Sequence, residues 1–328
     1  MTKVLIFISW PVKAWSIPDA QVEVLRARFP RIEFVHARTV DEARCLIGDV
    51  DVAFTPFLPR ELVAEASKLK WVHSPAAAVE GLLALSALGE RGVTISNSRG
   101  IQAVPMAESV MGGLLVLARK YDRTLEAQRA HRWIQNDLVN DWPWLLHGKR
   151  MTIVGLGSIG IEIAKRAHAF GMNITGVRRR PDQPKPRHVD RVVGSDRIHD
   201  ALDDCDILVL AAPGVAATQG MIGARELAML NPGAVLVNVA RAAIVDQEAL
   251  VQELQSGRLG GAVLDVFEKE PLAPGSPFWT MRNVVVTPHS SGFRSTHWID
   301  VIALFEDNLK RYRAGKPLRH LVDPAAGY

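Results

Sequence analysis

The chain has little cysteine and no long apolar run, and both shortages limit what it can be. Its 328 residues include two cysteines, Cys45 and Cys205, which lie far apart and form no Cys-x-x-Cys pair. This usage is typical of a reducing compartment, so we expect a cytoplasmic protein in which both cysteines are small buried residues. Apolar stretches stay below the roughly 20 residues of a membrane span. The apolar start at residues 4–8 is too short for a signal peptide, so we expect a soluble protein without a membrane partner.

Metal-binding patterns and a broad basic surface are also missing. The sequence has no His-x-x-x-His pair, no cysteine cluster and no acidic Asp-x-Asp-x-Asp loop, so we expect no metal site. The formal net charge is +4, and part of the excess is concentrated in one run, Arg178–Arg180. A protein that binds nucleic acid usually has a broader basic face with interleaved aromatic residues. We therefore expect no nucleic-acid partner.

Strand-like and helix-like segments alternate through the first hundred residues and again after Lys149. Such alternation predicts parallel sheets covered by helices. Hydrophobic residues make up 48% of the chain, and its length suits two domains with separate cores. In the first series we expect strands at 3–8, 32–36, 51–54, 71–73 and 93–95 and helices at 19–28, 40–47, 60–67 and 80–90. In the second series we expect strands at 151–154, 173–177, 207–210, 234–237, 262–264 and 284–286.

A glycine-rich run, Gly155-Leu156-Gly157-Ser158-Ile159-Gly160, separates the strand expected at 151–154 from an amphipathic helical pattern. A strand, a Gly-x-Gly-x-x-Gly turn and a helix form a dinucleotide-binding fingerprint. Gly155 permits the tight turn, Gly157 lets the backbone approach a pyrophosphate, and Gly160 lets the helix pack on the strand. The N–H groups at the helix start, at Ser158 and Ile159, would face the phosphates. The alternative is a βα turn in some other α/β protein.

This turn lies far from the N-terminus, after a complete αβ unit. We therefore predict two Rossmann-like αβα domains with parallel sheets, the second inserted into the first. The dinucleotide-binding domain is expected at 99–290, and a discontinuous substrate domain at 1–98 and 291–328, completed by a final helix at 298–313. Ligands commonly bind in the cleft of such an arrangement.

The strand expected at 173–177 ends in Arg178-Arg179-Arg180, which bears on coenzyme choice. An NAD enzyme usually ends this strand with a carboxylate that binds the ribose hydroxyls, and here none appears before Asp182. Arginines at this position would attract the 2′-phosphate of NADP. We predict that the protein prefers NADP(H), with NAD(H) as the other coenzyme. The alternative is a solvated basic loop that tolerates NAD(H).

Three segments of the second series place a functional residue at or just beyond the carboxyl end of a strand, where ligands of open α/β sheets bind. These residues are Arg241, Glu270 and His289. Together they suit the interconversion of a 2-keto acid and a 2-hydroxy acid. His289 can donate a proton to the developing alkoxide, Glu270 would favour the imidazolium and fix its tautomer, and the planar fork of Arg241 suits a carboxylate.

At these residues the chain resembles the D-isomer-specific 2-hydroxyacid dehydrogenases over nearly its whole length. The resemblance rests on Gly155–Gly160, Asn238–Arg241 followed by Ile244-Val245-Asp246, Asp265–Pro271 and Thr287-Pro288-His289. It implies that Arg241 binds the substrate carboxylate, that Glu270 and His289 form the acid/base pair, and that Asp265 contacts the nicotinamide side of the coenzyme. It also implies that the loop Ser74–Glu80, with Ala76, Ala77 and Ala78, holds the substrate carboxylate through backbone N–H groups. The implied coenzyme site further includes Pro213, Thr218, Val239, Ala240 and His289.

The resemblance favours NADPH-dependent reduction of glyoxylate, hydroxypyruvate or a similar small 2-keto acid to its D-2-hydroxy acid. A dehydrogenase of the same fold acting on a bulkier 2-keto acid or another small oxyanion is the alternative within the enzymes. A nucleotide-sensing scaffold, like corepressor relatives of the family, is the alternative outside them.

The pattern from Met106 to about His131 predicts one long helix with Pro105 in its first turn. Its first half is too apolar to face solvent, so we expect burial between the domains or against another subunit. The resemblance makes this helix a dimer contact, and a homodimer is expected.

Each candidate residue also has a plainer structural interpretation. Arg241 could be a structural ion-pair residue, Glu270 a turn residue, and His289 an ordinary surface or core histidine. His73 ends a strand beside the Ser74–Glu80 loop, where it either contacts substrate or is a satisfied strand-end histidine. Trp133, Trp142 and Trp144 either wall a pocket or simply pack.

Overall fold

The computed structural model describes residues 1–77, 79, 82 and 86–323. The chain divides into two compact units, which are described separately. Unit 1 consists of Met1–Ile101 and Arg294–Tyr328, and unit 2 of Gln102–Phe293. Ala78 and Glu80, which the sequence places in the expected substrate loop, lie outside the described residues.

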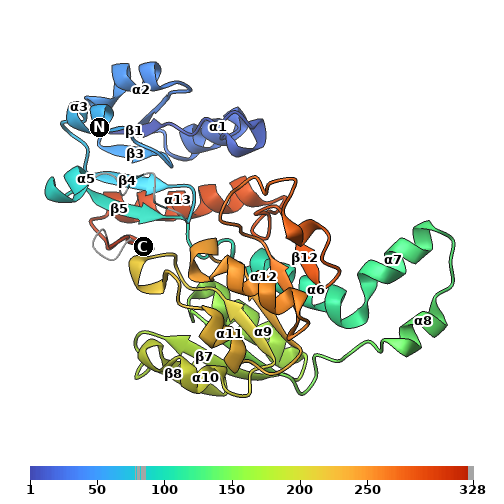
Figure 1. Cartoon of the computed structure of the whole chain (residues 1–328). Coiled ribbons are helices and arrows are strands. Elements are labelled where there is room, and N and C mark those ends of the chain that lie inside the picture. The colour runs from blue at the N-terminus through green and yellow to red at the C-terminus, as the bar shows by residue number, and fades with distance from the viewer. Residues whose placement is uncertain (78, 80–81, 83–85, 324–328) are drawn as a thin grey trace. The chain divides into compact units, whose positions relative to one another are not determined.

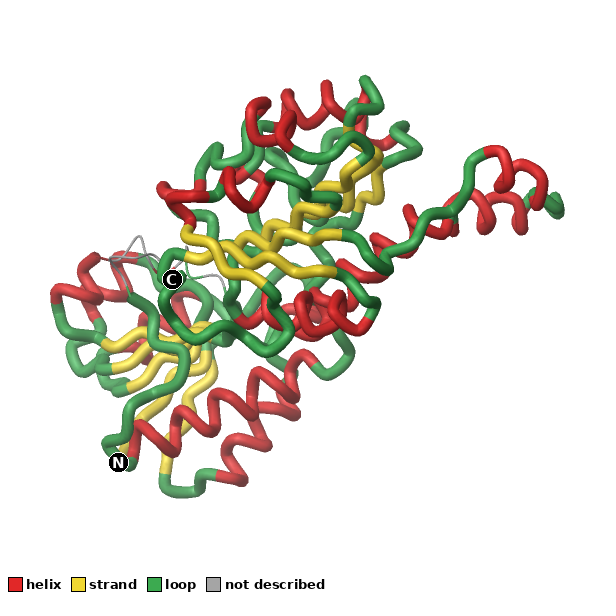
Figure 2. Tube along the Cα trace, turned by 90° about the horizontal axis from the view of Figure 1, so that it is seen from below, coloured by secondary structure: helices red, strands yellow, loops and turns green. Residues whose placement is uncertain are grey.

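Unit 1 is built on a five-stranded sheet in which neighbouring strands are parallel, in the order β2-β1-β3-β4-β5. Helices cover both faces: α1 and α13 pack on one side, and α2, α3 and α5 on the other. Figure 2 shows the strands of each unit as one sheet flanked by helices. The elements are β1 (Thr2–Ile6), η1 (Lys13–Trp15), α1 (Asp19–Arg28), β2 (Ile32–His36), α2 (Val40–Ile47), β3 (Val52–Phe54), α3 (Arg60–Glu65), β4 (Trp71–Ser74), α5 (Ser86–Glu90), β5 (Thr94–Asn97) and α13 (His297–Arg313).

Residues at the carboxyl ends of the unit 1 strands lie in one row across the sheet. Ile6 pairs with Phe54, Phe54 with His73, and His73 with Ser96. The loops that follow β1, β3 and β4 therefore leave the same edge, which brings the Ser74–Ala77 segment beside the loops of neighbouring strands.

Unit 2 holds a seven-stranded sheet in the order β12-β11-β10-β9-β6-β7-β8, again with parallel neighbours. From β6 the chain adds β7 and β8 on one side and then β9 to β12 on the other, so the strand order reverses between β6 and β9, as in dinucleotide-binding folds. Side chains of β9 alternate between two cores: Ile207 and Val209 face α6 and α9, whereas Leu208 and Leu210 face α10, α11 and α12.

The elements of unit 2 are α6 (Ala103–Arg119), α7 (Tyr121–Arg129), α8 (Gln135–Asn140), β6 (Arg150–Val154), α9 (Ser158–Ala169), β7 (Asn173–Arg178), β8 (Arg191–Gly194), η2 (Ser195–Arg197), α10 (His199–Leu202), β9 (Ile207–Leu210), η3 (Ala216–Thr218), α11 (Ala224–Met229), β10 (Ala234–Asn238), η4 (Ala242–Ile244), α12 (Gln247–Gln255), β11 (Leu259–Leu264), η5 (Pro277–Trp279) and β12 (Val284–Val286).

The prediction of one helix from Met106 to about His131 is wrong. The chain breaks at Lys120, which adopts a left-handed conformation with φ 57° between α6 and α7. The apolar half, α6, packs against α9 and β11 in the core of its own unit, so its composition needs neither a second domain nor a second subunit. Helices α7 and α8 extend away from the sheet of unit 2 (Figure 1).

Other expectations have mixed outcomes. The eleven expected strands are present with small shifts at their ends, while β8 and α8 were not expected.

Cys205 is buried as predicted, but Cys45 lies exposed on α2, so the prediction that both cysteines are buried is wrong for Cys45. Within the described residues, no helix is both long and apolar enough to cross a membrane.

Candidate active site

The glycine run forms the turn between β6 and α9 and lies where the sheet order of unit 2 reverses. Gly155 has φ +102°, and a Cβ there would lie 2.6 Å from the backbone nitrogen of Ala212. A Cβ on Gly160 would lie 2.0 Å from the carbonyl oxygen of Gly155. Both positions therefore require glycine.

Gly157 differs, because no described atom beyond its two chain neighbours lies within 4 Å of a Cβ built on it. It caps α9, whose first residues, Ser158 and Ile159, are exposed and half-buried. The open turn and the unsatisfied N–H groups at the start of a twelve-residue helix fit a pyrophosphate. The residues present thus fit a dinucleotide.

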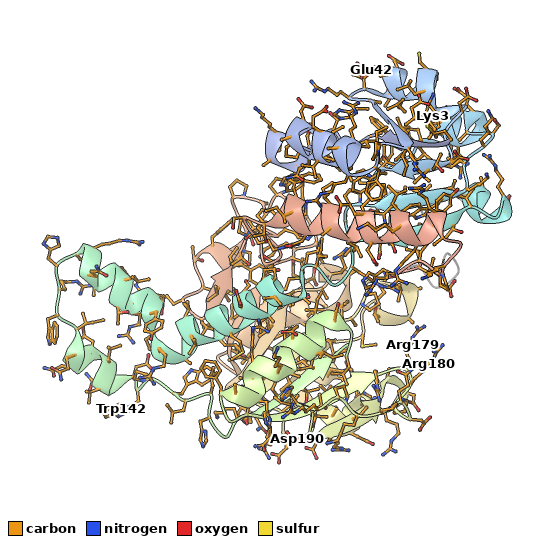
Figure 3. The ribbon with its side chains drawn as sticks, turned by 180° about the vertical axis from the view of Figure 1, so that it is seen from behind. Lys3, Glu42, Trp142, Arg179, Arg180 and Asp190 are labelled. Carbon is orange, nitrogen blue, oxygen red and sulfur yellow. The ribbon has the colours of Figure 1, made fainter. Side chains whose placement is uncertain are left out.

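The three arginines that begin at the last residue of β7, Arg178, Arg179 and Arg180, are not equivalent. Arg178 donates through Nη2 to the carbonyl oxygens of Pro181 and Pro184, both at 3.3 Å, and to that of Gln183. Its guanidinium therefore holds its own loop in shape. Arg179 and Arg180 are exposed, and Figure 3 shows both at the outer surface. They are the arginines placed to meet a soluble anion.

A compact turn follows β9. The Thr218 hydroxyl donates to the carbonyl oxygens of Pro213 at 2.7 Å and Val215 at 3.0 Å. A Cβ on the intervening Gly214 would lie 2.5 Å from Cγ of Arg241, so this turn packs directly on the arginine side chain. Pro213 and Thr218 thus shape the wall beside Arg241.

Arg241 is held at the end of β10 by Asn238. The Asn238 side chain donates to the carbonyl oxygen of Arg241 at 3.1 Å and accepts from the N–H of Ala240 at 3.0 Å. Val239 and Ala240 are buried, so they can contact a ligand through their backbone groups. The Arg241 side chain is half-buried, and its Nη1 donates to the carbonyl oxygen of Ala240 at 2.9 Å.

His289 and Glu270 form a pair. Nδ1 of His289 lies 2.8 Å from Oε2 of Glu270, whose other oxygen accepts from the N–H of Phe267 at 2.9 Å. Partial burial raises the Glu270 pKa, but the hydrogen bonds from His289 and Phe267 and the positive charges of His289 and Arg241 outweigh it. The pKa of Glu270 therefore lies below its usual value, and the carboxylate stays charged at neutral pH.

The His289 ring is 54% exposed, and Nδ1 faces Glu270. Nε2 is therefore the ring nitrogen placed to act on a bound molecule. Arg241 also lies close enough for its charge to act on Glu270. The structure thus brings Arg241, Glu270 and His289 into one neighbourhood of unit 2, where they can bind an anion and supply a proton.

Asp265 serves this site in a way that the sequence did not indicate. Its side chain is buried and accepts from the hydroxyl of Thr287 at 2.6 Å, the N–H of Ser290 at 2.9 Å and the N–H of Ser291 at 3.2 Å. It also accepts from the Ser291 hydroxyl. Its carbonyl oxygen accepts the N–H of His289, which has a left-handed φ of 51°. Asp265 thus holds the loop that carries His289.

In unit 1 the expected substrate loop follows β4, with Ala76 half-buried and Ala77 exposed. His73 is fully buried, so its interpretation as a satisfied strand-end histidine is correct. Trp133 and Trp142 are 90% and 71% exposed, whereas Trp144 packs beside the α6–α9 core. Among the described residues, no group of three or more His, Cys, Asp or Glu is arranged to hold a metal ion.

The chain is similar to characterised families and structures. The model of one family, described as D-isomer specific 2-hydroxyacid dehydrogenase, NAD binding domain, matches residues 111–291. The D-3-phosphoglycerate dehydrogenase of Methanocaldococcus jannaschii is 31% identical over 298 residues, 89% of this chain and 55% of that protein. The chain therefore spans about half the length of that relative.

Two further similarities cover more of the matched protein. The glyoxylate/hydroxypyruvate reductase B of Yersinia pestis is 33% identical over 243 residues, which are 73% of each protein. A solved D-isomer specific 2-hydroxyacid dehydrogenase from Xanthobacter autotrophicus, in complex with NADPH and MES, superposes with a TM-score of 0.83 at 30% identity. That alignment covers 100% of both chains.

Proposed function

The chain belongs to the D-isomer specific 2-hydroxyacid dehydrogenase family, and we propose that it reduces a small 2-keto acid to the D-2-hydroxy acid. It is an NAD(P)-dependent oxidoreductase that acts on CH–OH groups. Glyoxylate and hydroxypyruvate are the leading substrates, because the Yersinia relative is named for them. The observation that carries the proposal is the 2.8 Å pair between His289 and Glu270 with Arg241 beside it.

Each residue has a distinct role in this proposal. Arg241 binds the substrate carboxylate with its planar fork. When bound, the nicotinamide coenzyme supplies the hydride that the carbonyl carbon receives. The carbonyl oxygen gains the electron pair of the broken π bond and takes its proton from Nε2 of His289. Glu270 stabilises the imidazolium before transfer and orients the ring.

The coenzyme proposed is NADP(H), held by the Gly155–Gly160 turn and by Arg179 and Arg180. Gly157 leaves room for the pyrophosphate, and the two exposed arginines supply positive charge after β7. No carboxylate lies in β7 or between its end and Asp182 to select the ribose hydroxyls of NAD(H). The NADPH complex of the Xanthobacter structure supports this choice. Arg178 acts indirectly in this proposal, because it shapes the loop.

A bulkier 2-keto acid is the second candidate, and exposed aromatic side chains favour it. Trp10, Trp15 and Phe57 are 46%, 50% and 47% exposed. They follow β1 and β3, so they share the carboxyl edge of the unit 1 sheet with the Ser74–Ala77 loop. Phe57 is fixed by Thr55, whose hydroxyl donates to its carbonyl oxygen at 2.6 Å. These rings offer an apolar surface to a substrate side chain.

We also propose a homodimer that forms through α7 and α8. These helices and the segment after them extend from unit 2 and expose Leu125, Trp133, Val139, Trp142 and Leu145, which are between 45% and 90% exposed. Large exposed apolar surfaces commonly mark a protein interface. The molar mass in solution, measured by light scattering, should be twice the 36.0 kDa of one chain; a mass of one chain contradicts this proposal.

The function is tested by following oxidation of NADPH and, separately, NADH with glyoxylate, hydroxypyruvate, pyruvate, phenylpyruvate and 2-ketoisocaproate. Rapid loss of NADPH with a small keto acid supports the proposal, and rapid loss with phenylpyruvate favours the second candidate. Tight coenzyme binding without turnover of any of the five contradicts both and favours a nucleotide-sensing scaffold.

A further inference from the structure

His73 is a buried titratable residue that the proposed chemistry does not use. It lies at the carboxyl end of β4, packed among the rings of Phe54, Trp71 and Phe305, whose centroids are 5.5 to 5.8 Å from its own. Burial, together with the charge of His320, lowers the His73 pKa to about 3. The ring is therefore neutral at physiological pH and must have one donor and one acceptor nitrogen.

Four hydrogen bonds determine which nitrogen donates. Trp71 Nε1, which can only donate, reaches the Ser96 hydroxyl oxygen at 2.8 Å, and that hydroxyl lies 2.7 Å from Nδ1 of His73. Nε2 of His73 lies 3.2 Å from the Ser98 hydroxyl, which donates to the carbonyl oxygen of Ser74 at 3.0 Å. One assignment satisfies all four contacts: Ser96 donates to Nδ1, and Nε2–H donates to Ser98.

The opposite tautomer would break two of these contacts, the donation from Ser96 and the donation from Ser98 to Ser74. If Nδ1 carried the proton, the Ser96 hydroxyl would lose its acceptor. Ser98 would have to donate to Nε2 and would give up its hydrogen bond to the carbonyl oxygen of Ser74. Both hydroxyls are buried, where water cannot replace a lost hydrogen bond. The chain of donors therefore runs in one direction, from Trp71 to Ser74.

The same strand end also fixes the loop beyond Ser74. The backbone N–H of Ser98 donates to the carbonyl oxygen of Ala76 at 3.1 Å, and the Asn97 side chain donates to that of Ala77 at 2.7 Å. A trans peptide holds its C=O and N–H in opposite directions. Because the Ala76 carbonyl faces Ser98, the N–H of Ala77 points away from β5, and Ala77 is exposed.

We propose that His73, through Ser98, is a positioning residue that holds the Ser74–Ala77 loop with the Ala77 N–H turned outward to receive the substrate carboxylate. The identification of the bound group as a substrate carboxylate rests on the proposed function, whereas the orientation of the loop does not. His73 itself touches neither substrate nor coenzyme. Its contribution is to keep Ser98 donating to Ser74, so that the loop does not rotate its peptides.

The test compares Ser98→Ala with Ser67→Ala. Ser67 is a matched control, because its hydroxyl also donates to a carbonyl oxygen of unit 1, that of Gly48 at 3.1 Å, outside this network. Ser98→Ala should raise the KM for the 2-keto acid about tenfold or more, with the KM for NADPH within twofold of wild type. Ser98→Thr, which keeps the hydroxyl, should restore the KM. Equal effects on both KM values, or none, overturn the proposal.

Two further measurements keep the test independent of folding and of turnover. His73→Phe preserves the ring packing but removes the N–H donor, so the KM for the keto acid should rise. His73→Gln restores an N–H toward Ser98, so the KM should recover in part. Hydrogen exchange of the peptide spanning residues 74–77 should be faster in Ser98→Ala than in Ser67→Ala. Faster exchange in a protein that reduces no keto acid refutes the proposed function but supports the loop's positioning; unchanged exchange refutes the positioning.

Discussion

The Nδ1 atom of His289 lies 2.8 Å from Oε2 of Glu270, and both side chains remain partly exposed. Glu270 therefore holds the His289 ring in place while the ring stays accessible to a substrate from solution, and a proton donor needs both. Hydrogen bonds and positive charges keep the Glu270 pKa below its usual value despite partial burial. The electrostatic support of the imidazolium thus persists throughout the neutral range.

Replacing Glu270 with glutamine should lower kcat about 10- to 100-fold at pH 7, because the amide keeps a hydrogen-bonding group but removes the negative charge beside the imidazolium. Glu268→Gln is the matched control, since Glu268 is an exposed carboxylate on the same segment. Steady-state kinetics of both variants provide the check. Equal kcat values for the two would show that Glu270 has no special role.

The depressed pKa of Glu270 also sets a pH dependence. The pair's stabilising contribution is present above the ordinary carboxyl pKa and is lost as pH falls through the lower value in the folded protein. Wild-type kcat/KM should therefore keep the Glu270 contribution down to about pH 4.5. The Glu270 side-chain carboxyl, followed by 13C NMR in the wild-type protein, should remain ionised from pH 8 down to about pH 4.5. A carboxyl that becomes protonated near pH 6 would contradict the lowered pKa.

Ser291→Ala should slow the reaction through the loop that carries His289. The variant loses the hydroxyl that donates to the buried Asp265 carboxylate, a bond to a charged group that is typically worth about 1.5–3 kcal/mol. We expect kcat to fall about tenfold or more and the melting temperature to drop. Ser290→Ala is the control, because Ser290 reaches Asp265 through its backbone N–H, which alanine keeps. Indistinguishable kinetics of the two variants would refute the role of the Ser291 hydroxyl.

Replacing Arg179 and Arg180 together with alanine should raise the KM for NADPH about 10- to 100-fold, as expected when charge-assisted bonds to a phosphate are lost. The KM for NADH should change less than about twofold. Arg178→Ala should instead weaken the binding of both coenzymes, because Arg178 holds the loop through three carbonyl oxygens. Kinetics with the two coenzymes separate the cases, and a double variant that affects NADPH and NADH equally would exclude the phosphate role.

Phe57→Ala should discriminate between small and bulky substrates. Burying a phenyl ring against another apolar surface contributes about 1.5–3 kcal/mol, so kcat/KM for phenylpyruvate should fall about tenfold or more. The value for glyoxylate should stay within about threefold. Phe170→Ala, which removes a 41% exposed ring of unit 2, is the control. If the two substrates respond alike to Phe57→Ala, the ring does not bind the substrate side chain.

His73 should impose a pH dependence on stability. Its folded pKa of about 3 lies below the ordinary value of 6.5, so between these values the unfolded chain binds a proton that the native protein does not. Stability therefore rises with pH across this window, by at most about 1.4 kcal/mol per pH unit. The difference in unfolding free energy between wild type and His73→Phe, measured by urea titration at pH 4 to 6, should rise accordingly. Parallel curves would contradict a buried neutral histidine.

Sequence patterns predicted the sheets well, because buried parallel strands are apolar runs bounded by turns. Residues 207–210 and 234–237 are fully buried, as their composition indicated. The break at Lys120 escaped prediction, since neither glycine nor proline marks it and the left-handed residue is a lysine. Strand β8 was missed because it is short and starts with an exposed arginine in a basic segment.

Candidate residues at strand ends could be named from the sequence, but their partners could not. Asp265 contacts donors 22 to 26 residues away, and the Ser98 hydroxyl meets His73 across 25 residues. Such contacts depend on strand order and register, which spacing along the chain does not encode. Arg178 is a further case, because its guanidinium is engaged by carbonyl oxygens of a proline-containing loop whose path the sequence does not specify.

The proposed role of His289 is to donate the proton to a 2-keto acid. Its most direct test is the single-turnover rate of His289→Gln with saturating NADPH and the best substrate of the panel, alongside the NADPH dissociation constant measured by fluorescence. We expect a rate at least about 100-fold below wild type, with the NADPH dissociation constant within twofold. A variant that reduces the keto acid as fast as wild type would contradict it.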